Sequence, residues 1–216
     1  MRTTHQYLEK YPIAPDSEKL IVGTIHPHHH DNFLLPFFYG NVLSVWSILG
    51  EAFPQDLPKP LTLEGIVKFL HHKKISVSDT IISCERKNPT ALDQDLTCIE
   101  LNTQIIADIR NSNITEVLFT SGFGKNNAFK LFYEDILGLK ITKEIRVNRE
   151  VMLDEKVFGR PIKLTVLYSP SGSSNVGLSK SKAYLEYRER RKDDGPMQRP
   201  VFDFKVDYYR SKFGGK

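Results

Sequence analysis

Four loop segments hold the residues of this 216-residue chain that are best suited to chemistry, and each follows a short apolar segment. The first, residues 23–31 (GTIHPHHHD), is rich in histidine and leads to the aromatic residues 37–39. The second, residues 83–95, carries Cys, Glu, Arg and two Asp residues, and the other two, 121–127 and 169–175, are rich in Ser, Gly and Asn. Imidazoles and carboxylates can exchange protons or bind metal ions, whereas small residues let backbone N–H groups approach an anion.

The histidine-rich loop places five possible metal ligands close together, at His26, His28, His29, His30 and Asp31. Such groups suit zinc or iron. Adjacent histidines in a loop cannot all converge on one ion without a sharp turn, so we expect no metal here but a polar surface loop or phosphate contacts. The loop Gly122–Lys125 lacks the spacing of the Walker and dinucleotide-binding glycine motifs. A metal-dependent hydrolase and a nucleotide enzyme therefore stay minor alternatives.

The elements that must position these loops are short strands and amphipathic helices. Buried strands are predicted at Lys19–Ile25, Thr80–Cys84, Glu116–Ser121 and Lys163–Ser169. Three of these are nearly continuous apolar runs, which is typical of parallel strands covered on both faces. Helical periodicity fills the intervals, in residues 42–53, 63–70, 105–109 and 129–136. The alternation predicts a three-layer α/β/α sandwich around a central, mainly parallel four-stranded sheet, with all four loops at one edge.

Length and composition predict one domain, residues 1–192, followed by a C-terminal tail, residues 193–216, that wraps the domain or stays mobile. Residues 140–160 are polar, with a possible hairpin at 151–159.

No apolar run approaches the ~20 residues needed to cross a bilayer, and we see no secretory signal. The two cysteines cannot form a disulfide framework. We therefore expect a cytoplasmic protein, and a monomer.

Positive charge gathers toward the C-terminal end of the chain. From Lys156 onward there are 14 Lys and Arg residues against 6 Asp and Glu, although the whole chain carries a net charge of only +4. A basic region suits a polyanionic partner, because each phosphate contact releases counterions. A solvated helix face with a charged tail explains the same composition, and composition alone favours that explanation.

Taken in order, the motifs resemble those of the uracil-DNA glycosylase superfamily, nearest its mismatch-specific and hypoxanthine-excising branches. The resemblance rests on the strand end GTIHP at 23–27, on the aromatic pair Phe38-Tyr39 before Gly40 and the later Trp46, on DTIISCERKN at 79–88 with Asp93, and on SPSGSS at 169–174. These motifs span residues 19 to 185. They occur along the chain in the family's order.

The resemblance implies excision of a flipped base from DNA without a metal or an organic cofactor. It implies that Tyr39 stacks on the base, with Phe38 as the alternative, although both could equally be core aromatic residues. Thr120, Ser121 and Asn126 would hydrogen-bond the base edge. The loop of Ser169, Pro170, Ser171, Gly172, Ser173 and Ser174 would clamp a DNA phosphate, helped by Lys180 and Lys182, although an ordinary serine-rich turn has the same composition.

The chain departs from this family where the catalytic group belongs. Members place Asn, Asp or Glu before the proline of the first motif, whereas His26 or Ile25 stands there in this chain, depending on the alignment. His26 is the candidate general base, because imidazole titrates near neutral pH. Asp79 or Asn41 could instead hold the water. The sequence thus predicts a DNA glycosylase acting on uracil or hypoxanthine, or else a catalytically impaired nucleic-acid-binding module of the same fold.

Overall fold

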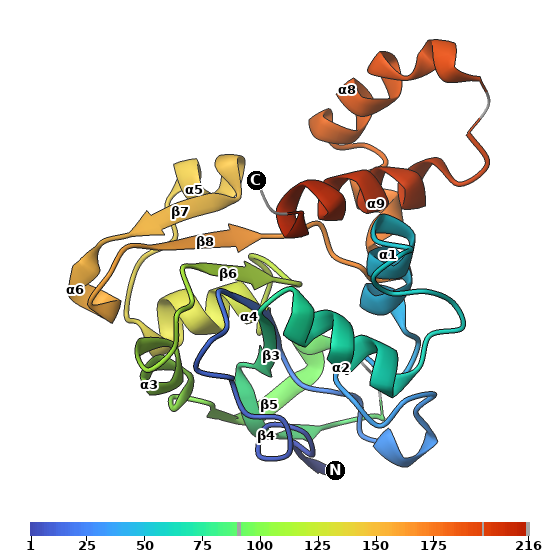
Figure 1. The fold of residues 1–216 in the computed structure, drawn as a ribbon. Coiled ribbons are helices and arrows are strands. Elements are labelled where there is room, and N and C mark those ends of the chain that lie inside the picture. The colour runs from blue at the N-terminus through green and yellow to red at the C-terminus, as the bar shows by residue number, and fades with distance from the viewer. Residues whose placement is uncertain (90–91, 196, 215–216) are drawn as a thin grey trace.

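The computed structural model describes residues 1–89, 92–195 and 197–214, and it has a mixed α/β architecture with two sheets (Figure 1). The larger sheet has the strand order β3-β2-β6-β8-β7. Its strands are β2 (Lys19–Gly23), β3 (Ile75–Asp79), β6 (Glu116–Phe119), β7 (Glu150–Leu153) and β8 (Ile162–Val166). All neighbours in it are parallel except β7 and β8. The sheet therefore has five strands. The prediction of four strands was wrong, because it did not include the antiparallel edge strand β7.

The smaller sheet is antiparallel and has the order β1-β4-β5. It consists of β1 (Arg2–Thr4), β4 (Ile81–Arg86) and β5 (Leu96–Leu101). The predicted strand Thr80–Cys84 belongs mostly to this sheet, so its assignment to the parallel sheet was wrong. The strand that pairs with β2 is β3, which ends at Asp79, immediately before that segment. The chain thus passes from one sheet to the other within a single residue.

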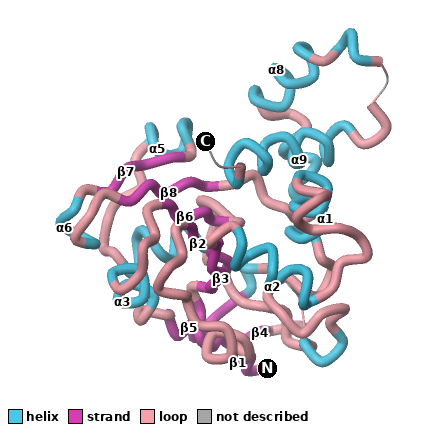
Figure 2. Tube along the Cα trace, viewed as in Figure 1, coloured by secondary structure: helices cyan, strands magenta, loops and turns pink. Residues whose placement is uncertain are grey.

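Helices cover both faces of the larger sheet, which gives three layers (Figures 1 and 2). One core packs α1 (Ser44–Ala52), α2 (Leu63–His72) and α9 (Pro200–Phe213) against alternate residues such as Ile21 and Leu118. The other core packs helices on the opposite face against Leu20, Val22 and Phe119. Those helices are α3 (Ile105–Arg110), α4 (Ala128–Lys130) with the π-helical turn Leu131–Ile136, α5 (Lys143–Asn148) and α6 (Glu155–Phe158).

The C-terminal part of the chain is more regular than the sequence indicates. Two helices, α7 (Asn175–Leu178) and α8 (Lys182–Arg190), follow the last strand, and α8 projects from the body in Figure 1. The expected tail contains α9, which packs against α1, so this segment wraps the domain. The division of the chain at residue 192 stays a prediction. The possible hairpin at 151–159 was wrong, because these residues form β7 and α6, and the partner of β7 is β8, beyond that helix.

Among the described residues, no helix is long and apolar enough to span a membrane.

Candidate active site at the ends of the parallel strands

A cavity of about 220 Å³ lies beyond the carboxyl ends of β2, β3, β6 and β8. It brings together segments that are far apart in the chain, and Pro27 and Pro170 both line it. Of the sequence-predicted residues, it is lined by His26, Tyr39, Asn41, Asp79, Thr120, Ser121, Ser169, Pro170, Ser171 and Gly172. Ligands of open α/β sheets bind at such strand ends. The geometry therefore supports a single site built from these loops.

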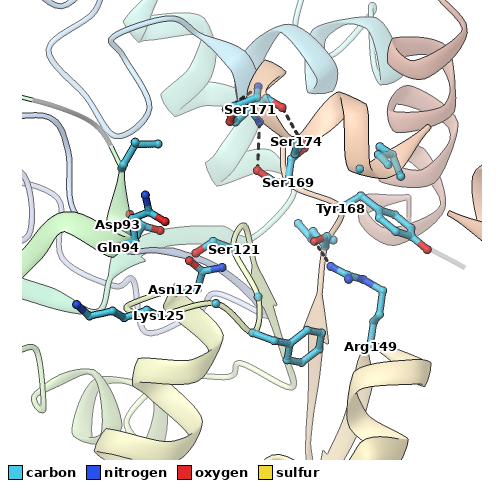
Figure 3. Close-up of a pocket in the computed structure, with 18 of the residues that line it drawn as sticks. Asp93, Gln94, Ser121, Lys125, Asn127, Arg149, Tyr168, Ser169, Ser171 and Ser174 are labelled. Carbon is cyan, nitrogen blue, oxygen red and sulfur yellow. Dashed lines mark hydrogen bonds between the residues drawn. The ribbon is translucent and has the colours of Figure 1, made fainter. Parts of the chain in front are cut away.

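A larger cavity of about 600 Å³ adjoins the first and shares Asp93, Ser121, Ser169 and Ser171 with it (Figure 3). Its wall also carries two cationic side chains, Lys125 and Arg149, and the aromatic ring of Tyr168. The Arg149 guanidinium lies 4.6 Å from the centre of that ring and donates to the backbone carbonyls of Val166 and Leu167. The two cavities therefore adjoin through these four shared residues, and the larger one has two cationic side chains in its wall.

Asp79 is held by a histidine that sequence reasoning missed. His5 Nε2 lies 2.8 Å from Asp79 Oδ2, and the His5 side chain is only 1% exposed. His5 Nδ1 accepts the backbone N–H groups of Tyr7 and Leu8, so the ring proton must be on Nε2, where it is donated to the carboxylate. This arrangement fixes the orientation of the Asp79 carboxylate at the wall of the smaller cavity. His5 follows β1, and only the long-range pairing of β1 with β4 brings it here.

Tyr39 lies against Asp79 at the end of β2. Its hydroxyl is 3.1 Å from Thr120 Oγ1, and its backbone has a positive φ of 56°. Burial raises the pKa of Tyr39 well above its ordinary value, and the negative charge of Asp79 adds to the effect. The phenol therefore stays protonated and can act as a hydrogen-bond donor beside a ligand. Phe38, the alternative stacking residue, is 1% exposed and belongs to the core, and it does not line either cavity.

Asp93 lies at the junction of the two cavities. The Thr24 hydroxyl donates to its Oδ1 at 2.8 Å. Burial raises the pKa of Asp93 to about 6, and the nearby charge of Asp79 acts in the same direction. Asn126, predicted to contact a base, instead donates its side-chain amide to the backbone carbonyls of Asp93 and Leu96. Asn126 therefore fixes the turn that carries Asp93 and lines neither cavity.

His26 is 5% exposed, and both of its ring nitrogens are engaged with backbone groups. Nε2 accepts the backbone N–H of Gln6 at 3.1 Å, and Nδ1 lies 2.8 Å from the carbonyl oxygen of Pro27, to which it donates. Burial lowers the pKa of His26 to about 4, with His5, His30 and Arg86 contributing. The ring is thus neutral at pH 7 and holds the loop, while the Arg86 guanidinium donates to the His26 carbonyl.

The serine loop 169–174 is held by internal hydrogen bonds and by a lysine from α9. The Ser174 hydroxyl donates to the carbonyls of Ser169 and Ser171. Lys205 is 2% exposed, and its ammonium donates to the Ser171 carbonyl at 3.0 Å and to Asn175 Oδ1 at 2.7 Å. Burial lowers the pKa of Lys205 to about 8. Sequence reasoning missed Lys205, because this residue lies in the segment expected to be an irregular tail.

Several predicted contacts lie outside the cavities. Lys180 and Lys182 are exposed and line neither of them, and Lys182 pairs with Glu186 in α8. Ser173 and Ser174 line only the larger cavity. In the described part of the chain, no three His, Cys, Asp or Glu side chains are grouped closely enough to hold a metal ion. His28 is instead hydrogen-bonded to Thr3, and His30 lies 3.4 Å from Asp31.

Comparison with known proteins gives one structural likeness. No protein-family model matches the chain, and no curated protein matches it significantly. Among solved structures, it is similar to the solution NMR structure of a Methanosarcina acetivorans protein provisionally assigned as a uracil DNA glycosylase. The two share 14% sequence identity and a TM-score of 0.49, over 98% of each chain. A likeness of this size does not by itself assign a family or an activity.

Proposed function

We propose that this protein is a DNA glycosylase that hydrolyses the N-glycosidic bond of a flipped deaminated base, uracil or hypoxanthine, in DNA. One observation carries the proposal. Residues of the motifs that resemble those of uracil-DNA glycosylases, spread from Thr24 to Gly172, meet around one cavity that holds an aromatic hydroxyl, two carboxyl groups and part of the serine loop. An extruded base needs such a pocket, with a ring to stack on and polar groups for its edge.

In the proposed mechanism, the base enters the smaller cavity beside Tyr39. The hydroxyls of Thr120 and Ser121 then face its edge at the end of β6. The Asp79 carboxylate, oriented by His5, holds a water molecule and takes its proton as the water oxygen attacks C1′ of the sugar. The C1′–N bond breaks, the electron pair leaves with the base, and an abasic sugar remains. We assign this role to Asp79 in place of His26, whose nitrogens are both engaged.

Binding of the DNA backbone is assigned to the serine loop. Residues 169–172 line the smaller cavity, and small side chains there let backbone N–H groups approach a phosphate. Lys125 and Arg149 line the adjoining cavity and add positive charge to it. Because such contacts release counterions, we expect binding to weaken as the salt concentration rises.

A second candidate is a nucleic-acid-binding module that has kept the pocket but does not cleave. The state of His26 favours it, because the residue before Pro27 supplies neither a carboxylate nor a carboxamide and has no free ring nitrogen. On this interpretation Asp79 would serve only to hold the N-terminal segment through His5.

Excision assays on oligonucleotides distinguish the two candidates. Duplex and single strands with uracil, hypoxanthine, xanthine or a G·T mismatch are incubated with the protein, and abasic sites are then cleaved with alkali. We expect strand breaks at uracil or hypoxanthine, reduced at least about 100-fold in Asp79→Asn. Asp31→Asn is the matched control, because its side chain is 91% exposed and lines neither cavity. Binding without breaks across the panel would contradict the glycosylase and support the module.

A further inference from the structure

We infer that Asp93 donates a proton to the departing base, so that the site favours a purine such as hypoxanthine over uracil. This inference rests on the proposed function and adds a second catalytic residue to it. Asp93 lies in the turn Asp93–Asp95, immediately before β5. It is also one of the four residues that line both cavities.

The position of Asp93 brings its carboxyl group to the same cavity as Asp79. The two come from different elements, the end of β3 and the turn before β5, and both line the smaller cavity. In Figure 3 Asp93 lies beside Ser121 at the edge of the larger cavity. The Asn126 side-chain amide donates a hydrogen bond to the Asp93 backbone carbonyl, and the Thr24 hydroxyl donates one to Asp93 Oδ1. A base in the smaller cavity would therefore lie beside two carboxyl groups, each held by a hydrogen bond from another segment.

The two carboxyl groups have different hydrogen-bond partners. Asp79 accepts a hydrogen bond from His5 Nε2 at 2.8 Å, which orients its carboxylate in the wall of the smaller cavity. Asp93 is buried beside Asp79, and these two causes raise its pKa to about 6, while Thr24, Arg86 and Ser121 oppose them. The other ionisable groups that line the two cavities are His26, Tyr39, Lys125, Arg149 and Tyr168. Paired carboxyl groups with separated protonation states divide general acid from general base in other glycosidases.

The chemistry of the leaving base connects this acid to purines. As the C1′–N9 bond breaks, its electron pair passes into the purine ring, and the Asp93 carboxyl proton passes to a ring nitrogen of the base. The base then leaves neutral and Asp93 becomes a carboxylate. The attacking water forms the new C1′–O bond and gives its proton to Asp79. In uracil, N1 carries the sugar and N3 already carries a hydrogen, so no other ring nitrogen has a free lone pair to receive such a proton. Uracil can leave as an anion, and its excision does not need the acid.

The test compares hypoxanthine and uracil excision by the wild type, Asp93→Asn and Asp95→Asn under single-turnover conditions from pH 5 to 9. Asp95 is the matched control, because it lies in the same turn and lines neither cavity. We expect the wild type to prefer hypoxanthine, with a rate that falls as the pH rises through about 6. Asp93→Asn should lose hypoxanthine excision at least about 100-fold together with this pH dependence, and change uracil excision only a few-fold.

The possible failures are distinguishable. If the wild type excises neither hypoxanthine nor uracil, the proposed function itself is overturned. Uracil excised as fast as hypoxanthine, or an Asp93→Asn variant that slows both bases alike, would overturn the role of Asp93 and leave the glycosylase intact. A folding defect is checked by the thermal unfolding of each variant, and a merely structural role would not change the ratio between the two bases.

Discussion

Gly23 shows at the residue scale how closely the site is built. A Cβ at this position would lie 2.4 Å from both Asp79 Oδ1 and the Tyr39 hydroxyl oxygen. No side chain fits there without moving the proposed catalytic carboxylate and the stacking tyrosine together. The first motif thus needs its glycine for the close approach of two side chains from other segments, rather than for an unusual backbone angle.

His26 gives a prediction about stability and pH. Its pKa is about 4 in the folded protein and near 6.5 in an unfolded chain, so the unfolded state binds the proton more readily. The stability that neutral His26 contributes is therefore complete above pH 6.5 and is lost as the pH falls toward 4. The full change is about 3 kcal/mol.

In urea unfolding experiments, we expect the free energy of unfolding to fall less between pH 6.5 and pH 4 in His26→Gln than in the wild type. The two proteins must be compared with each other, because the raised pKa of Asp93 increases the stability of both as the pH falls over the same range. This contribution cancels in the comparison. Equal pH dependence in the two proteins would show that His26 is not buried in its neutral form.

At the scale of elements, the sequence predicted β2, β6 and β8 because their apolar runs are nearly continuous. It missed β3 because serine interrupts the pattern at Ser76 and Ser78. Both side chains are buried, and they are satisfied by Ser17 and Asn102, which come from elsewhere in the chain. Alternation of serine with apolar residues usually indicates a strand with one face in solvent. In β3 that face is buried, and the serine hydroxyls form hydrogen bonds with protein groups in place of water.

Helix α9 was missed for a related reason, because it buries residues on two sides. Tyr209 and Phe213 pack into the core with α1, whereas Phe204 packs with α8. Apolar residues on two faces remove the single stripe on which helix prediction depends. The predicted loops did converge, but His5 and Lys205 could not be assigned to the site, because each reaches it only through long-range packing.

The hydrogen bonds from Lys205 of α9 to the serine loop and to Asn175 lead to a prediction about this loop. Lys205→Met keeps the aliphatic chain and removes the ammonium, which leaves the Ser171 carbonyl and Asn175 Oδ1 without this donor. We expect the catalytic efficiency on DNA to fall about tenfold, mainly through KM, because a hydrogen bond to a charged group contributes about 1.5–3 kcal/mol. Limited proteolysis should also become faster within residues 169–181.

Lys68→Met is the control for Lys205→Met. It makes the same change of charge on a side chain that is 75% exposed and forms an ion pair with Glu64 in the same helix. If both variants behave like the wild type, the serine loop does not depend on α9.

At the scale of the whole molecule, α9 determines whether residues 1–192 can fold alone. Three of its aromatic residues, Phe204, Tyr209 and Phe213, are at most 6% exposed. Burial of each contributes about 1.5–3 kcal/mol, and the sum is comparable to the net stability of an ordinary domain, about 5–15 kcal/mol. We expect a chain truncated after residue 192 to show no cooperative thermal unfolding by circular dichroism. A cooperative transition would instead support the division at residue 192.

The contacts of His5 and Lys205 have a consequence for synthesis in the cell. One contact is made by the segment next to the first strand, and the other by a helix that leaves the ribosome after all the other described elements. A nascent chain that has already formed its parallel sheet would still lack the support of its serine loop. Under the proposed function, fragments released by ribosome stalling before α9 should therefore lack base-excision activity, and incomplete copies of the protein would leave DNA intact.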